Sequence, residues 1–217
     1  MKRLRVWFGL TGLLLASSMA WAADKPGAPP VDLAQRLDEV QADPARMATF
    51  IRTGEKVAAV CANCHGDGGY SIKPDVPNLA GQNSSYLLEQ VRLFAEGKRK
   101  YEFMEGMIKA MNADEKVGMV LFYSSREVPR KPVTDARLAK RGQEIFSSNC
   151  FRCHGNDGRG NAQFARIAGQ QAEYLRKNLK RYRDKDPVRP NPLMRATTQM
   201  LSDDDINALA VYVSSMP

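Results

Sequence analysis

The chain has 217 residues, of which 43% are hydrophobic, and its formal net charge is +8 at pH 7. Such a length accommodates one or two small domains. A basic chain invites comparison with nucleic-acid-binding proteins, but residues 23–217 carry a net charge of only +5, and we exclude that class.

Residues 1–22 have the features of a secretory signal peptide. Basic residues at positions 2, 3 and 5 precede a mostly apolar stretch over residues 6–15, and residues 20–22 read Ala-Trp-Ala, a suitable cleavage site. A retained membrane anchor is the alternative, but the apolar stretch is short for a spanning helix. We therefore predict an exported, periplasmic protein with at most peripheral contact with a membrane.

The segment 23–43 is predicted to be an N-terminal leader, Pro-rich up to residue 30 and then a short helix over residues 31–41. An amphipathic helix is predicted next, over residues 44–60, and it leads into Cys61-Ala62-Asn63-Cys64-His65. The same arrangement returns further along the chain. A helix over residues 135–146, capped by Thr134, leads into Cys150-Phe151-Arg152-Cys153-His154.

Cys-x-x-Cys-His is the attachment pattern of c-type haem, in which each thiol adds to a vinyl group and the histidine becomes an iron ligand. The two copies use all four cysteines and both histidines of the chain. Disulfides, a redox Cys-x-x-Cys pair or a zinc site are the alternatives, and repetition of the whole pattern argues against them. We predict two covalently attached haem c groups, bound through these residues: Cys61, Cys64, His65, Cys150, Cys153 and His154.

Each motif is followed by an Ala-Gly-Gln turn, at residues 80–82 and 168–170, and by a second helix. The first such helix is predicted over residues 85–96 with Ser84 as its N-cap, and Tyr86, Gln90 and Phe94 share one of its faces. Its counterpart is predicted over residues 172–183. Its other face carries five basic residues that either steer an acidic partner or form an ordinary solvated face: Arg176, Lys177, Lys180, Arg181 and Arg183.

A last helix closes each half, and its N-terminus is marked by capping signals at residues 112–115 and 202–205, the second with Asp where a capping box prefers Glu. No segment alternates as a strand does, so we predict an all-α protein. Landmarks recur at offsets of 88 to 90 residues, which indicates a duplication. We expect domains over residues 44–128 and 135–217, joined by a linker over residues 129–134.

The sixth iron ligand is predicted by elimination and by the repeat. No histidine or cysteine remains, and methionine is the ordinary alternative in cytochromes c. Met104 and Met194 occupy equivalent places, in a loop before the last helix, and are our predicted ligands; Met107 is the rival in the first half. We expect each proximal imidazole to be held through Nδ1–H by a backbone carbonyl, that of Pro77 or Ala165.

The pattern Cys-x-x-Cys-His-Gly, Pro-x-Leu-Ala-Gly-Gln, Tyr-Leu, Gln, Phe resembles the cytochrome c4 family over about residues 50–217. The resemblance implies two cytochrome c domains about a pseudo-twofold axis, with axial ligation by His65 and Met104 and by His154 and Met194. The sequence departs from the family in the long segment before Cys61 and in Ala165, which stands where the first half has proline.

The same resemblance implies an electron carrier rather than an enzyme, with no catalytic residues. Expected partners are redox proteins: a membrane respiratory complex or a dehydrogenase as donor, and a terminal oxidase or reductase as acceptor. The alternative is the haem subunit of a periplasmic dehydrogenase, as in flavocytochromes. A di-haem enzyme is less favoured, because it needs an open iron or a distal His or Cys, and neither residue type is left over.

Overall fold

The computed structural model describes residues 31–217, and all regular secondary structure in that range is helical. The all-α prediction is therefore confirmed. The predicted signal peptide and the Pro-rich start of the leader lie outside the described residues. Within residues 31–217 no helix combines the length and the apolar character needed to cross a bilayer.

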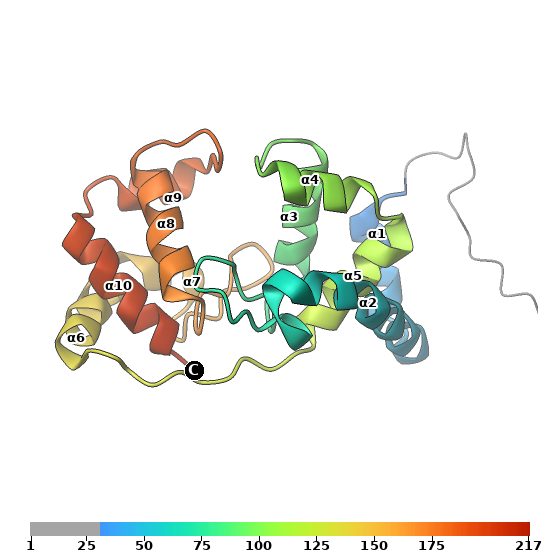
Figure 1. Cartoon of the computed structure of the whole chain (residues 1–217), viewed down its shortest axis with the longest axis horizontal. Helices are drawn as coiled ribbons and strands as arrows, with labels where there is room; N and C mark the ends of the chain where they lie inside the picture. The colour runs from blue at the N-terminus through green and yellow to red at the C-terminus, as the bar shows by residue number, and fades with distance from the viewer. Residues whose placement is uncertain (1–30) are drawn as a thin grey trace, which may run out of the picture.

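The first half contains five α-helices and one short 3₁₀ turn, in this order: α1 Leu33–Gln41, α2 Pro44–His65, η1 Asp67–Gly69, α3 Ser84–Ala95, α4 Glu102–Lys109 and α5 Ala113–Ser124. The second half repeats the plan without α1, as α6 Ala136–Ile145, the π-helix η2 Phe146–Cys150, α7 Phe151–His154, α8 Ala172–Arg183, α9 Pro192–Thr198 and α10 Asp203–Ser215. Figure 1 shows the two halves side by side, with the connecting segment running along one edge of both.

Most helix boundaries follow the predictions, and the differences have local causes. Helix α2 continues through the first motif to His65, and α6 is capped by Asp135 rather than Thr134, since its carboxylate accepts from Leu138 N–H at 2.9 Å. Asn83, rather than Ser84, stands at the N-cap of α3. Its side-chain amide makes no cap bond because it donates to carbonyl oxygens at residues 159 and 164 of the other half.

The last helix of each half begins at a complete capping box, as the sequence indicates. In α5 the Asn112 side chain accepts from Glu115 N–H while Glu115 accepts from Asn112 N–H, both at 2.9 Å. In α10 Ser202 and Asp205 make the same reciprocal pair at 3.1 and 3.0 Å. The shorter Asp side chain therefore closes a capping box here as completely as Glu does.

In each half the helix that leads into the Cys-x-x-Cys-His motif crosses the last helix at very close range. A Cβ atom added to Gly54 of α2 would lie 2.0 Å from the carbonyl oxygen of Gly118 in α5, and one added to Gly142 of α6 would lie 2.1 Å from that of Ala208 in α10. Only glycine permits such an approach of two backbones.

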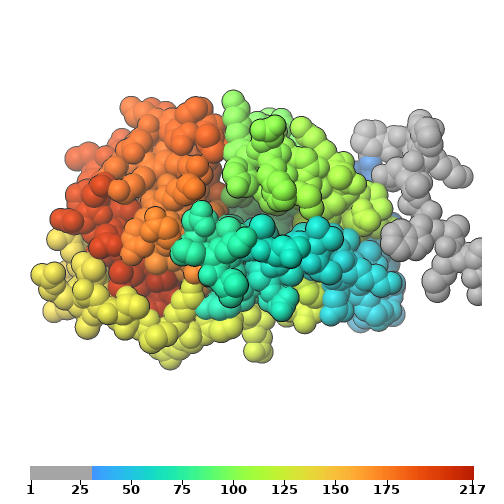
Figure 2. All heavy atoms as spheres, in the orientation of Figure 1, coloured from blue at the N-terminus to red at the C-terminus, as the bar shows by residue number. Residues whose placement is uncertain are grey.

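The two Ala-Gly-Gln turns hold the halves together reciprocally. Gln82 donates to the Arg166 carbonyl at 2.8 Å and accepts from Arg166 N–H at 2.7 Å. Gln170, its repeat equivalent, donates to the Asn78 carbonyl at 3.0 Å and accepts from Asn78 N–H at 2.7 Å. Asn78 and Arg166 are themselves equivalent at an offset of 88 residues, so each half grips the same backbone position of the other. In the space-filling view the halves meet along a continuous boundary (Figure 2).

Candidate haem sites

One cavity of about 1000 Å³ receives both Cys-x-x-Cys-His motifs. Helices α3 and α4 of the first half and α8 and α9 of the second contribute side chains to its walls. Its volume is at the upper end of the range of about 300–1,000 Å³ that is usual for a ligand site. The two candidate sites are therefore parts of a single cavity between the halves.

The two histidines are oriented in the same way. Each lies at the end of a helix that stops at once, because Gly66 and Gly155 adopt φ values of 76° and 78°. His65 Nδ1 lies 2.9 Å from the Pro77 carbonyl oxygen, and His154 Nδ1 lies 2.8 Å from that of Ala165. With the proton on Nδ1 held by the carbonyl, Nε2 is left to ligate a metal.

These contacts confirm the prediction for both halves, including the one at Ala165, where proline is absent. Burial lowers the pKa of His65 and of His154, and the carbonyl partner opposes that shift only in part. A lowered pKa keeps each imidazole neutral, which is the form that binds iron.

The four cysteines have free thiols, with no disulfide among residues 31–217. Burial raises the pKa of Cys61 and raises that of Cys150 to about 11. A raised pKa disfavours the thiolate, which both a zinc site and a redox Cys-x-x-Cys pair require.

The predicted methionine ligands occupy matching positions. Met104 is the third residue of α4 and Met194 the third of α9; both are half-buried and line the cavity. The sequence predicted a loop at both methionines, and this prediction was wrong. In α9 the start is fixed by Asn191, whose side chain accepts from Met194 N–H at 2.9 Å. Met107 also lines the cavity, so the geometry brings both candidates of the first half to it.

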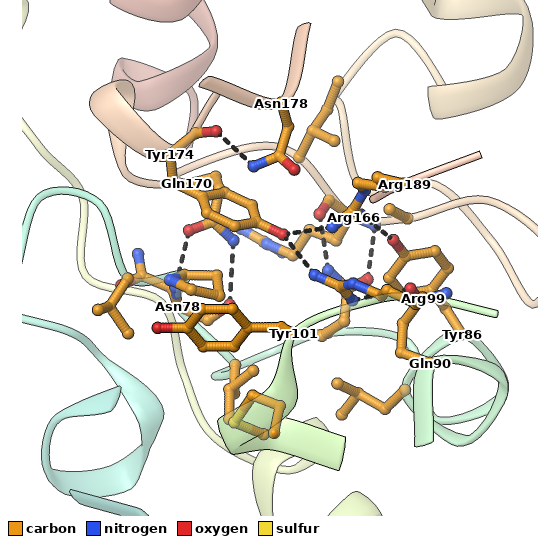
Figure 3. Close-up of a pocket in the computed structure, with 18 of the residues that line it drawn as sticks. Asn78, Tyr86, Gln90, Arg99, Tyr101, Arg166, Gln170, Tyr174, Asn178 and Arg189 are labelled. Carbon is orange, nitrogen blue, oxygen red and sulfur yellow. Dashed lines mark hydrogen bonds between the residues drawn. The ribbon is translucent and has the colours of Figure 1, made fainter. Parts of the chain in front are cut away.

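A cluster of arginine and tyrosine side chains crosses the boundary between the halves (Figure 3). Tyr174 accepts from Arg99 at 3.0 Å and from Arg189 at 2.8 Å. Arg189 also donates to Tyr86 at 3.1 Å and to Tyr182. The two arginines were not among the site residues predicted from the sequence. Arg99 and Arg189 occupy equivalent positions of the repeat, 90 residues apart, and this equivalence was the signal that could have indicated them.

Neither arginine of this cluster has a carboxylate partner among residues 31–217. Burial raises the pKa of Tyr174, but the two guanidinium groups outweigh it and bring that pKa down to about 8. Two cations held in a cavity without an acidic partner are a site for anions. Haem carries two propionate carboxylates, so the cavity walls, the imidazoles and this cluster all fit that group.

The basic face of α8 is largely neutralised by its own half. Four of its five basic residues form ion pairs, Arg176 with Glu173, Lys180 with Asp203, Arg181 with Asp186, and Arg183 with Asp184 and Asp203. These contacts favour the solvated-face interpretation over long-range steering of a partner.

Comparisons with known proteins agree with the geometry. Residues 139–217 match the family model described as cytochrome c. Over 193 residues the chain is 30% identical to cytochrome c4 of Azotobacter vinelandii, a likeness that covers 79% of this chain and 91% of that protein. The chain belongs to the cytochrome c4 family.

Two further relatives extend this result. The structure of reduced recombinant cytochrome c4 from Pseudomonas stutzeri has a TM-score of 0.69 and 30% identity, and the match covers 76% of this chain and 98% of that one. A protein of Thiomonas intermedia named thiosulfate dehydrogenase electron acceptor is 33% identical in an alignment of 176 positions, and the match covers 74% of this chain and 80% of that protein. Cytochromes c4 are electron carriers with two tandem cytochrome c domains, and the predicted fold and the two covalently attached haem c groups are confirmed.

Proposed function

We propose that this cytochrome c4 is an exported, periplasmic di-haem electron carrier and not an enzyme, with domains over residues 44–128 and 135–217 and a linker over 129–134. Cys61 and Cys64 attach the first haem and Cys150 and Cys153 the second. His65 and Met104 ligate one iron, and His154 and Met194 the other. Met104 is preferred to Met107 because it matches Met194 in repeat position and in its place in a short helix.

The observation that carries this proposal is the pairing, in one cavity, of two equivalent histidines with two equivalent methionines. When bound, haem supplies reversible one-electron exchange at its iron. The protein holds each Nε2 by fixing Nδ1, excludes water with apolar walls, and offers Arg99 and Arg189 to the propionates. With one iron held by His65 and Met104 and the other by His154 and Met194, no coordination site would be left for a substrate.

A respiratory complex or a dehydrogenase is the proposed electron donor, and a terminal oxidase or reductase the acceptor. The Thiomonas relative, by its name, accepts electrons from thiosulfate dehydrogenase, which supports a dehydrogenase as donor. A haem subunit bound permanently to such a dehydrogenase is the second candidate. Copurification separates the two: a carrier is isolated alone and reduced on mixing with the dehydrogenase, whereas a subunit is isolated as a stoichiometric complex.

The first experiment is the visible spectrum of the protein matured in a host with c-type haem machinery. We expect two covalent haems per chain and a weak far-red band, characteristic of ferric iron bound by methionine, at the intensity of two sites. A deficit in that band would reveal an open iron and return substrate chemistry to consideration.

The same band distinguishes the rival ligands of the first half. Met104→Ala is expected to remove about half of the far-red intensity, and Met107→Ala to leave it unchanged. The reverse result would assign the first iron to Met107.

A further inference from the structure

Tyr123, near the end of α5, is a buried phenol that the proposed haem ligation does not use. It is 1% exposed, and it lines the cavity. Its hydroxyl has no hydrogen-bond partner among residues 31–217. A buried hydroxyl left unpaired is unfavourable, so a partner is expected to come from the group that fills the cavity.

The surrounding backbone holds the Tyr123 ring in one place. A Cβ atom on Gly69, whose φ is 87°, would lie 2.6 Å from Tyr123 Cδ1, so the ring packs directly against a residue that has no side chain. The Phe122 ring meets it edge-on, with centroids 5.2 Å apart. The Tyr123 carbonyl also accepts from Gly81 N–H at 2.9 Å. Because these contacts hold both the ring and the backbone, the hydroxyl stays away from solvent.

The neighbouring polar group is the Cys61 thiol. Tyr123 belongs to the core cluster of the first half, Cys61 packs against that cluster, and both residues line the cavity. Burial raises the pKa of Tyr123, and the Cys61 thiol adds to that rise. In the free chain Cys61 Sγ donates to the Val57 carbonyl at 3.7 Å. Attachment to a vinyl group forms an S–C bond and transfers the thiol hydrogen to the vinyl carbon. The resulting thioether sulfur can only accept a hydrogen bond, and a buried donor stands beside it.

The second half lacks this donor. Val213 makes the same backbone bond as Tyr123, its carbonyl accepting from Gly169 N–H at 3.0 Å, and it also lines the cavity. The two positions are thus structural equivalents 90 residues apart, one with a phenol and one with an apolar side chain. Burial also raises the pKa of Cys150, but no hydroxyl group contributes to that rise.

We propose that the Tyr123 hydroxyl donates a hydrogen bond to the thioether sulfur of Cys61 and thereby makes the two haem sites electronically unequal. This inference rests on the proposed attachment of haem at Cys61. The hydroxyl directs its positive end toward the haem edge and stabilises the added electron in a low-dielectric site. It therefore raises the reduction potential of the first haem and leaves that of the second unchanged.

The test compares Tyr123→Phe with Tyr212→Phe, which removes the same atom from α10 at the position next to Val213. Spectroelectrochemical titration of the two-haem protein is expected to show a lower midpoint potential for one haem in Tyr123→Phe and wild-type values for both haems in Tyr212→Phe. Unchanged potentials in Tyr123→Phe, or equal shifts of both haems, would overturn the proposal.

A second measurement needs no variant. Resonance Raman spectra of the wild type in H₂O and D₂O are expected to differ in the C–S stretching mode of one thioether only, because the deuterated hydroxyl alters one sulfur. Identical spectra would contradict the hydrogen bond. A count of covalent haems precedes both measurements: fewer than two overturns the proposed function, whereas two haems without these effects overturn only the role of Tyr123.

Discussion

At the residue scale, the proposed function depends on fixing four side chains that the repeat places in equivalent pairs. His65 and His154 share one orientation because each gives its Nδ1 to a backbone carbonyl eleven or twelve positions further along the chain. The carbonyl belongs to the backbone, so either proline or alanine can supply it. Rigid imidazoles of this kind give metal ligands a defined geometry and basicity.

Replacing Met194 by alanine should remove the sixth ligand of one iron. We expect about half of the far-red band to disappear and the potential of one haem to fall, because a thioether ligand favours the reduced state over water. Met200→Ala is the control, since that side chain is 86% exposed, and it should leave both signals unchanged. Two unchanged potentials in Met194→Ala would show that the assigned ligand is wrong.

At the scale of single elements, short polar motifs fix where helices begin, and glycine fixes how closely they cross. The capping box of α10 is a local device that the sequence predicts and the structure contains. The crossings of α2 with α5 and of α6 with α10 depend on a residue whose importance is visible only when the partner helix is in place.

The carboxylate of Asp205 should make α10 sensitive to acid. Hydrogen bonds from Ser202 and the Arg141 guanidinium lower the pKa of Asp205 to about 2. A folded-state pKa below the unfolded value of about 3.9 means that its stabilisation is complete above about pH 5 and is lost as the pH falls from about 4 to about 2.

Asp205→Asn is therefore expected to destabilise the holoprotein by about 1 kcal/mol at pH 7 and by much less at pH 2 to 3, measured by denaturant unfolding. The control Asp204→Asn changes an exposed neighbour in the same turn and should have a smaller, less pH-dependent effect. An equal loss at both pH values would mean that the ionised carboxylate is not what stabilises the cap.

Gly54→Ala should force α2 and α5 apart. Its Cβ would stand 2.0 Å from the Gly118 carbonyl oxygen, a backbone atom that cannot rotate away. We expect a loss of about 1–3 kcal/mol in the free energy of unfolding. Gly106→Ala is the matched control, because no atom lies within 4 Å of its added Cβ, and it should stabilise α4 by about 0.5–1 kcal/mol. A neutral Gly54→Ala would show that the crossing can relax.

At the scale of the whole molecule, the two halves form one cavity because equivalent glutamines of each half make hydrogen bonds to the backbone of the other. Gln82 and Gln170 make hydrogen bonds to the backbone of Arg166 and Asn78, which in a separate domain would bond to water. Lys131 of the connecting segment reinforces the boundary by donating to Gln171 at 2.6 Å. Close contact of the halves keeps the two candidate haem sites within one shielded space.

The double variant Gln82→Ala/Gln170→Ala should loosen this boundary. It removes the four hydrogen bonds that the two glutamines make between the halves, each contributing about 0.5–1.5 kcal/mol, while both domains keep their own cores. We expect trypsin to cleave the segment after Arg130 at least about tenfold faster, the equivalent of about 1.4 kcal/mol. Gln143→Ala, on the exposed face of α6, is the control. An unchanged cleavage rate would show that other contacts hold the halves together.

The sequence alone predicted the parts of this protein that depend on local chemistry. The Cys-x-x-Cys-His spacing indicates haem attachment because the thiols and the imidazole act together within five residues. Counting the remaining ligand types left methionine, the repeat selected Met104 and Met194, and helix periodicity with capping signals placed nearly every helix. The N-cap residues of α3 and α6 and the short helices that carry the methionines were missed, because local side-chain contacts decide them.

Only the tertiary structure decided which residues contact each other when they are some 90 positions apart in the chain. The fusion of two haem sites into one cavity, the glutamine contacts, the Arg99 and Arg189 cluster and the unpaired Tyr123 hydroxyl all depend on how the halves and helices are placed. Periodicity and spacing report which face of a helix is apolar, but they do not report which distant residue it meets. The sequence therefore determined the chemistry of each haem site, and the packing of the two halves determined their common environment.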